Sequence, residues 1–534
     1  LPAMFIDFDG AEKFRYDYYR LCHLLFINNF IKPIYEWCEA NGCRVTGHAV
    51  EESTLSGQMW CCGGVMPFYE YEHIPGIDYL GRGLSSDIAP KQLGSVCAQL
   101  GKKKAISEMF ACCGWDVKPS ELKRIAELQY AGGVNMMCQH LYSYTERGQR
   151  KRDYPAHYSE HNPWQPYLSD FDRFFNNLGY TLSLGEEYAT ALVIHPIHSA
   201  WYKRHLDAAS IEELEGKFSD LVGKLSSVQL PYHFGDETMM ARLASVKKEG
   251  DSVRLIVGRC AYKYVILPFV YTIDSSTERL LREFISLGGR VYLYDGRPYA
   301  VDGRKADLSF LSSNCTFDEI SEDRDALLSF GGGDTSDLRM TVRITDFGRI
   351  FYIVNLSDHS LRDIKLRIKN CDGVVSLDMD DLKEGGAAYT SENGEISVRF
   401  DLGSCESVVF VEKSGAAPDV YKTEEYETIV LPRRMKFVSR PENCINLDCA
   451  QISYDGINYG IRLPIPCIKD KLYRARYEGR LWVRYSFEIC GPIQKIHAAV
   501  EPMKNCLVEI NGEAVSSDDG YFYDRTFRTY DITR

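Results

Sequence analysis

The sequence of 534 residues lacks several features that would place it in a special class. It has no run of 18 or more uncharged apolar residues, which excludes a protein that spans a membrane by helices. An excess of positive charge is also missing, because 75 acidic residues outnumber 62 basic ones and the net charge is −13. A surface of this sign repels phosphate groups, so we expect neither nucleic acid nor a membrane as a partner.

Familiar cofactor and metal motifs are absent too. No GxSxG or P-loop pattern occurs, and Gly81-Arg82-Gly83 lacks the residues that continue a dinucleotide-binding fingerprint. Cys444 and Cys449 are too far apart for a zinc-ribbon pair, and no CxxC repeat takes their place. The sequence therefore predicts no nucleotide cofactor and no metal site.

Hydrophobic residues make up 45% and charged residues 26% of the chain, which is the balance of a globular protein. The length predicts three or four domains. The 35 tyrosines are numerous, and a tyrosine-rich core is the favoured interpretation.

Eighteen cysteines could suggest disulfides, but a chain of this length has core enough without them. The neighbours Cys61-Cys62 and Cys112-Cys113 are also poorly placed to bridge each other. Reduced thiols and the lack of a visible secretory signal predict a cytoplasmic location. Because the chain begins with Leu1 rather than Met, we expect an N-terminal segment to be missing from it.

Helical and strand patterns alternate through residues 1–185. Apolar residues at helical spacing predict helices at 11–41, 91–100, 120–130 and 167–184. Short apolar runs predict strands at 43–50, 104–110 and 134–141, with a loop from 51 to about 90. Strands that alternate with helices predict a parallel sheet, open or closed into a barrel.

The remaining chain divides into three further regions. Residues 186–315 predict a smaller α/β layer with its own parallel sheet. From there to residue 413 the period changes to two, which predicts a β-sandwich, and 414–419 is the clearest linker. Residues 414–534 are again rich in strand patterns and stop before a second sandwich closes.

Polar and aromatic residues follow the strands of the first region. They are His48, Glu52, Glu108, Trp115, Gln139, His140 and Tyr142. The carboxyl ends of parallel strands meet at one edge, where α/β barrels place their active sites. Paired carboxylates cleave glycosidic bonds, one donating a proton while the other attacks or activates water. Aromatic rings stack on sugars, and His, Gln and Tyr bind hydroxyl groups.

Simpler interpretations stay open for several of these residues. Glu108 taken alone could be a solvated carboxylate, and His140 could be a core histidine bonded to a backbone carbonyl. Because side chains alternate along a strand, only one of Glu51 and Glu52 is expected to face the site.

Two further groups have structural interpretations that are favoured over functional ones. His195 and His198 could form a metal pair, but Pro196 lies between them and no third ligand is near in the sequence. The basic residues 147–152 predict a solvated loop, with a carboxylate clamp as the alternative.

Four segments carry a resemblance to a known group of proteins. They are TGHAVEES, YEYEHIPGIDYLGR, PKQLGSVCAQLGKKKAISEMFACCGW and GGVNMMCQHLYSYTERGQRKRDYP. Together they resemble large bacterial glycoside hydrolases allied to family 106, the α-L-rhamnosidase type, and more distantly to family 42 β-galactosidases. GEEYATALVIHPIHSAW and the later EINGEAV extend the resemblance over nearly the whole chain.

This resemblance implies a fold of four parts. They are the C-terminal part of a (β/α)8 TIM-type catalytic barrel (1–185), a flavodoxin-like α/β domain (186–315), a β-sandwich (316–413), and a truncated galactose-binding-like jelly roll (414–534). Such relatives carry an upstream Asp-Glu-Pro segment that has no counterpart here. We therefore expect a catalytic site that is incomplete within this chain, or completed by residues outside it.

The resemblance also implies roles for the strand-end residues. Glu108 matches the glutamate of the strand that ends in SE and is expected to act as nucleophile or base. Glu52 matches the glutamate of the GHxxxE segment and is expected to be the partner acid or a ligand of a sugar hydroxyl. The sugar pocket would be lined by His48, Trp115, Gln139, His140 and Tyr142. A calcium cofactor is implied by the resemblance only, because the sequence contains no calcium-binding loop motif.

Three hypotheses follow for the function. The first is a glycosidase that cleaves an oligosaccharide by a carboxylate pair, in the manner of an α-L-rhamnosidase. The second is a non-catalytic carbohydrate-binding or scaffolding protein. The third, and weakest, is another α/β enzyme that uses a cysteine.

Overall fold

Contacts within the chain divide it into two units, Leu1–Lys422 and Thr423–Arg534. The computed structural model describes residues 2–84, 86–145, 147–203, 208–331, 333–422, 429–436, 438–439, 443–492, 495–502 and 506–533. In these ranges no helix has the length and apolar character needed to cross a membrane. All 18 cysteines are free thiols.

A long helix lies near the start of the first unit, after a short 3-10 turn (Pro2–Met4). α1 (Ala11–Phe26) continues through a π-helical turn (Ile27–Ile31) into α2 (Lys32–Ala40), which confirms the helix predicted over 11–41. Tyr16 is buried on the side that packs against α8 (Ile197–Lys203). The apolar residues of the predicted pattern lie mostly on the exposed side: Phe14, Tyr18, Leu21, Leu25, Phe30, Ile34 and Trp37.

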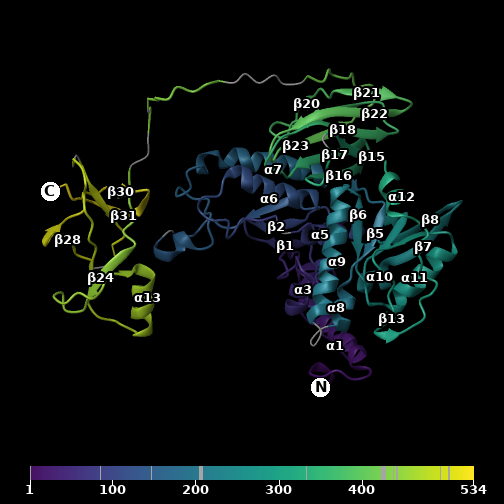
Figure 1. The fold of residues 1–534 in the computed structure, drawn as a ribbon, viewed down its shortest axis with the longest axis horizontal. Helices are drawn as coiled ribbons and strands as arrows, with labels where there is room; N and C mark the ends of the chain where they lie inside the picture. The colour runs from purple at the N-terminus through teal and green to yellow at the C-terminus, as the bar shows by residue number, and fades with distance from the viewer. Residues whose placement is uncertain are drawn as a thin grey trace. The chain divides into compact units, whose positions relative to one another are not determined.

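The first parallel sheet has the order β1-β2-β3, with strands Gly76–Tyr79, Ile106–Met109 and Met136–Gln139 (Figure 1). β2 and β3 confirm the strands predicted at 104–110 and 134–141. The strand predicted at 43–50 is reduced to a single parallel bridge from Thr46 to Ile74. Beyond Thr46 the chain leaves the sheet, because the Glu52 carboxylate draws the backbone N–H of Ala49 into a loop.

The loop predicted from 51 to about 90 contains three elements. They are α3 (Leu55–Cys61), α4 (Met66–Glu70) and β1 itself. β1 begins at Gly76, directly after Pro75, and because both residues are typical of turns this stretch predicts a loop. Among the described residues the strands form an open sheet, not the closed barrel of a complete (β/α)8 domain.

Helices α5 (Ile88–Leu100), α6 (Pro119–Ala131) and α7 (Leu168–Ser183) accompany this sheet. α5 ends where Gly101 adopts φ +71°, a left-handed conformation that glycine takes without strain. α5 and α6 meet at glycines: a Cβ on Gly94 would overlap the carbonyl oxygen of Gly132 and lie 3.0 Å from Gly133 Cα. α5 also packs against β6 of a second sheet, so it lies between the two layers.

The second parallel sheet has the order β12-β10-β5-β6, with strands Arg290–Leu293, Tyr264–Leu267, Ala191–Ile194 and Tyr232–Gly235. Its two central strands, β5 and β10, are buried throughout, as strands covered on both faces must be. The parallel sheet predicted for this region is therefore present. The accompanying helices are α8, α9 (Ala208–Ser227), α10 (Glu237–Leu243), α11 (Ser275–Ser286) and α12 (Phe317–Glu322).

Short strands complete this layer. A meander β7-β8-β9 is formed by Ala244–Glu249, Ser252–Val257 and Cys260–Tyr262. A small sheet β11-β13-β14 is formed by Thr272–Ile273, Ala300–Val301 and Arg304–Lys305.

A sandwich of two antiparallel sheets follows, in the region predicted to have period-two strands. One sheet is β15-β18-β22-β21: Ala326–Phe330, Leu361–Lys369, Glu395–Leu402 and Tyr389–Glu392. The other is β20-β19-β23-β17-β16-β4: Glu384–Gly385, Val374–Leu377, Ser407–Glu412, Gly348–Asn355, Leu338–Thr345 and Glu186–Glu187. Because β4 precedes the second parallel sheet in sequence, its pairing with β16 ties the sandwich to the α/β part.

The second unit contains short strands and one helix, α13 (Ile465–Arg474). Its sheets are β25-β24-β26 (Leu463–Pro464, Cys449–Ser453, Trp482–Arg484), β27-β31-β30 (His497–Val500, Asp524–Asp531, Tyr521–Phe522) and the hairpin β28-β29 (Val508–Ile510, Glu513–Val515). The hairpin turns at Asn511-Gly512, where both residues have positive φ.

Candidate active site

The carboxyl edge of the first parallel sheet gathers four titratable residues: His48, Asp78, Glu108 and His140. They follow one another at nearly equal intervals of the chain, as the repeat of a strand–helix unit requires. Asp78 and Glu108 are paired in register across β1 and β2, so both side chains point to the same face of the sheet. Cys138 on β3 continues this row.

Glu108 lies between two imidazole rings. Its Oε2 is 3.1 Å from His48 Nε2, and its Oε1 is 4.0 Å from His140 Nε2. The Glu108 side chain is 27% exposed, so the carboxylate is partly desolvated but still open to a ligand. This is the predicted strand-end position, and the structure brings His48 and His140 to it.

His48 is held from its other side by the backbone. Its Nδ1 is 2.7 Å from the carbonyl oxygen of Ala49. Burial by itself would lower the pKa of His48. The Ala49 carbonyl and the nearby carboxylates of Asp78, Glu52 and Glu108 act in the opposite direction. Their combined effect is larger, so the pKa of His48 is raised above its ordinary value.

Asp78 is a member of this cluster that the sequence prediction missed. Its Oδ1 is buried and has no hydrogen-bond partner among the described residues. Burial raises the pKa of Asp78, the Glu108 charge adds to the rise, and His48 and His140 oppose it. A sign of this residue was present in the sequence, because Asp78 stands midway between His48 and Glu108.

Glu52 lies in a closed environment. It is 1% exposed, and its carboxylate accepts hydrogen bonds from Tyr69 Oη at 2.7 Å, Asp78 N at 2.7 Å and Ala49 N at 3.2 Å. Burial raises the pKa of Glu52 to about 7 in spite of these bonds. Glu52 thus anchors the backbone of two site segments, while its neighbour Glu51 is exposed on the loop.

Gln139 and His140 end on different sides of β3. Gln139 Nε2 donates to Asp172 Oδ1 of α7 at 2.8 Å, so this side chain faces the helix and not the Glu108 cluster. His140 faces the cluster, and its buried Nδ1 has no partner among the described residues. The alternative of a core histidine bonded to a carbonyl is therefore not what the structure shows.

Aromatic residues lie on the loops that follow β2 and β3. Trp115, on the loop after β2, is 40% exposed, and its ring centroid lies 5.3 Å from that of His157. Tyr142, after β3, is 66% exposed. Tyr154, which was not predicted, meets the His140 ring edge-on at 5.8 Å. Such rings can provide a stacking surface for a sugar.

The residues do not fit the calcium ion that the resemblance allows. His48, Asp78 and Glu108 each offer one ligand atom, and these atoms lie within 4.8 Å of one another. Calcium takes six to eight oxygen ligands, whereas one of these three donors is an imidazole nitrogen. We derive no step through calcium.

His195, which directly follows β5, and His198 of α8 are both buried. His198 Nδ1 lies 2.8 Å from Asp274 Oδ1, and the Tyr16 hydroxyl of α1 donates to the same carboxylate. The His198 ring also stacks on Trp201 at 3.9 Å. These contacts of His198 join α1 to the second layer. His198 also forms a buried group with Glu237 and Asp274, whose ligand-type atoms lie within 4.8 Å of one another, whereas His195 is not part of that group.

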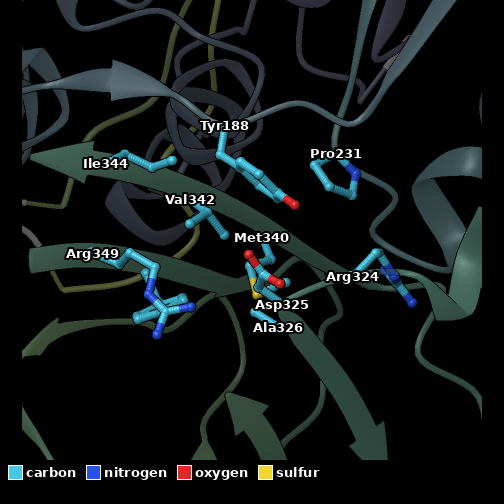
Figure 2. Close-up of a pocket in the computed structure, with 10 residues that line it drawn as sticks. Tyr188, Pro231, Arg324, Asp325, Ala326, Met340, Val342, Ile344 and Arg349 are labelled. Carbon is cyan, nitrogen blue, oxygen red and sulfur yellow. The ribbon is translucent and has the colours of Figure 1, made fainter. Parts of the chain in front are cut away.

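A small cavity of about 20 Å³ lies elsewhere, between the sandwich and the second parallel sheet (Figure 2). Its lining is Tyr188, Pro231, Arg324, Asp325, Ala326, Met340, Val342, Ile344, Arg349 and Phe351. No member of the Glu108 cluster lines it, so it does not extend the candidate site.

Comparisons by sequence find no relative: no family model and no curated protein matches the chain. Comparisons of structure do. A rhamnosidase from Novosphingobium sp. PP1Y is similar with a TM-score of 0.60 and 15% identity, over 85% of this chain and 44% of that one. GH42 β-galactosidase from G. stearothermophilus has a TM-score of 0.50 and 10% identity, over 75% and 69% of the two chains.

A third solved structure, the β-galactosidase from Bacillus circulans sp. alkalophilus, has a TM-score of 0.50 and 9% identity, over 75% of this chain and 68% of that one. At such identities the likeness concerns the fold. The chain spans less than half the length of the rhamnosidase. The chain thus resembles, in its fold, the glycoside hydrolases of the rhamnosidase and family 42 β-galactosidase kinds.

Proposed function

We propose that this chain has the activity of a glycoside hydrolase and that Glu108 is its catalytic carboxylate. The observation that carries the proposal is the position of Glu108: partly exposed at the carboxyl edge of a parallel sheet, between His48 and His140 and beside Asp78. This is where α/β folds hold their reacting groups. The fold shared with solved glycosidases supports the same class of reaction.

Each neighbour of Glu108 has a task in this proposal. An ionised Glu108 attacks the anomeric carbon or activates water there. Asp78 replaces Glu52 as the candidate partner carboxyl, because it is paired in register with Glu108 and its side chain points to the same face of the sheet. Trp115, Tyr142 and Tyr154 would stack on the rings.

The substrate is an oligosaccharide, and an α-L-rhamnoside is the first to test. The rhamnosidase has the highest TM-score of the structures described above, and the predicted resemblance names the same activity. Glu52 acts as a positioning group in this scheme, because its three hydrogen bonds fix Ala49 beside His48 and the backbone of Asp78.

The test is hydrolysis of a panel of aryl glycosides by the wild-type chain and by Glu108→Gln. Removing a positioned catalytic carboxylate should lower kcat/KM by about 10²–10⁴-fold. Glu51→Gln is the matched control, because this neighbouring carboxylate is exposed on the loop and should be silent. Undiminished hydrolysis in Glu108→Gln would refute the assignment. Sugar binding by calorimetry without hydrolysis of any glycoside would favour the carbohydrate-binding alternative.

A further inference from the structure

The ring of His48 is fixed at both nitrogens. A carbonyl oxygen only accepts hydrogen bonds, so the Nδ1 that lies 2.7 Å from Ala49 O must carry a hydrogen. The opposite nitrogen, Nε2, lies 3.1 Å from Glu108 Oε2. Two bare lone pairs at this distance would repel each other, so one hydrogen must also lie between His48 and Glu108.

That hydrogen belongs either to an imidazolium or to a protonated Glu108, and the surroundings distinguish the two. The groups that face His48 are Asp78 from β1, Glu52 from the following loop and Glu108 from β2, with His140 beyond Glu108. Three carboxyls around one imidazole stabilise a positive ring. The 3.1 Å contact then is a charge-assisted hydrogen bond, of the kind that fixes a carboxylate in place.

We propose that His48 is a positioning residue: an imidazolium, oriented by the Ala49 carbonyl, that keeps Glu108 ionised and fixes its Oε2. The Oε1 atom, 4.0 Å from His140, is left to meet the substrate. This inference rests on the proposed function and deepens it. Glu108 then acts as nucleophile or base, and the proton for the leaving oxygen comes from another group.

The pH dependence of kcat/KM tests this role. Loss of a cation beside Glu108 should make the carboxylate easier to protonate, so the acidic limb of His48→Gln should move up by about 1–2 pH units. His48→Lys, which restores a positive charge, should bring the limb back toward the wild-type position. His359→Gln is the matched control, since His359 forms an exposed pair with Asp358 at 3.3 Å on the sandwich. An acidic limb that does not move in His48→Gln overturns the proposal.

A second readout does not depend on hydrolysis. Nitrogen NMR of the His48 ring in the full chain, assigned with His48→Gln, should show two protonated nitrogens at pH 7. In Glu108→Gln the His48 titration should move down by about 1 pH unit or more. An unprotonated Nε2, or a titration that Glu108→Gln leaves unchanged, contradicts the inference. If the NMR result holds while no glycoside is hydrolysed, the ion pair stands and the proposed function fails.

Discussion

Glu72 and Glu52 are buried carboxyl groups whose protons bind more tightly in the folded protein. Burial raises the pKa of Glu72 to about 8, and that of Glu52 to about 7. In an unfolded chain both groups titrate near the ordinary value of about 4.5. Between that value and pH 8 the folded state therefore holds more protons, so the free energy of unfolding falls as pH rises.

Glu72→Gln should remove much of this fall in the free energy of unfolding with rising pH. Among the described residues Glu72 accepts one hydrogen bond, from Gly76 N at 3.3 Å, which the Gln oxygen can also accept. The drop in Tm of the first unit between pH 5 and pH 8 should therefore be smaller in Glu72→Gln than in the wild type. Glu392→Gln, on an exposed strand position, is the control and should keep the wild-type slope. If Tm changes with pH equally in Glu72→Gln and in the wild type, the pKa of Glu72 is not raised in the folded protein.

Packing between elements depends on close approach of backbones, most clearly at the crossing of α5 and α6. Gly94 there faces Gly132 and Gly133 with no room for a methyl group. Such an approach positions the strands that precede and follow these helices, including β2 with Glu108. The geometry of the site is thus set partly by residues that carry no side chain.

Gly94→Ala should destabilise the first unit by about 1–3 kcal/mol, the usual cost of overpacking. Gly216→Ala is the matched control, because Gly216 lies exposed in α9 with open space around it. Alanine at that position should stabilise the helix by about 0.5–1 kcal/mol. Urea unfolding of the two variants measures both values, and equal effects would contradict the assigned crossing.

The sequence predicts the helices and the strands that follow long, regular patterns, and it places Glu108 at a strand end. It does not predict β1, because Pro75 and Gly76 at the start of this strand are typical of turns, and Asp78 is missed with it. Gln139 and Glu52 were assigned to the site from their positions in the sequence. Which face each one occupies depends on register and on hydrogen bonds to Asp172 and Tyr69, which only the tertiary structure determines.

At the scale of the whole molecule, the two units differ in how much they bury. The first unit contains three large clusters of buried apolar residues. In the described part of the second unit, the cluster consists of Ala450, Ile452 and Ile468. Several strand residues of the second unit are also exposed, among them Val483 and Tyr521. Stability that rests on so small a core is low.

The second unit should therefore unfold at a lower urea concentration than the first. Trp482 is the only one of the six tryptophans in the second unit, so it reports on that unit by fluorescence. Trp482→Phe should remove the early transition, whereas Trp37→Phe, an exposed change in the first unit, should leave it in place. A Trp482 signal that changes together with the main transition would show that the units unfold as one.

Chemical rescue of Glu108→Ala tests most directly whether the Glu108 carboxylate reacts. Removing this side chain opens space beside His48 for a small anion such as azide or formate. If the carboxylate is the reacting group, Glu108→Ala should hydrolyse activated aryl glycosides very slowly, and added azide or formate should restore part of the rate. Wild-type rates in Glu108→Ala without any added anion would contradict the central claim.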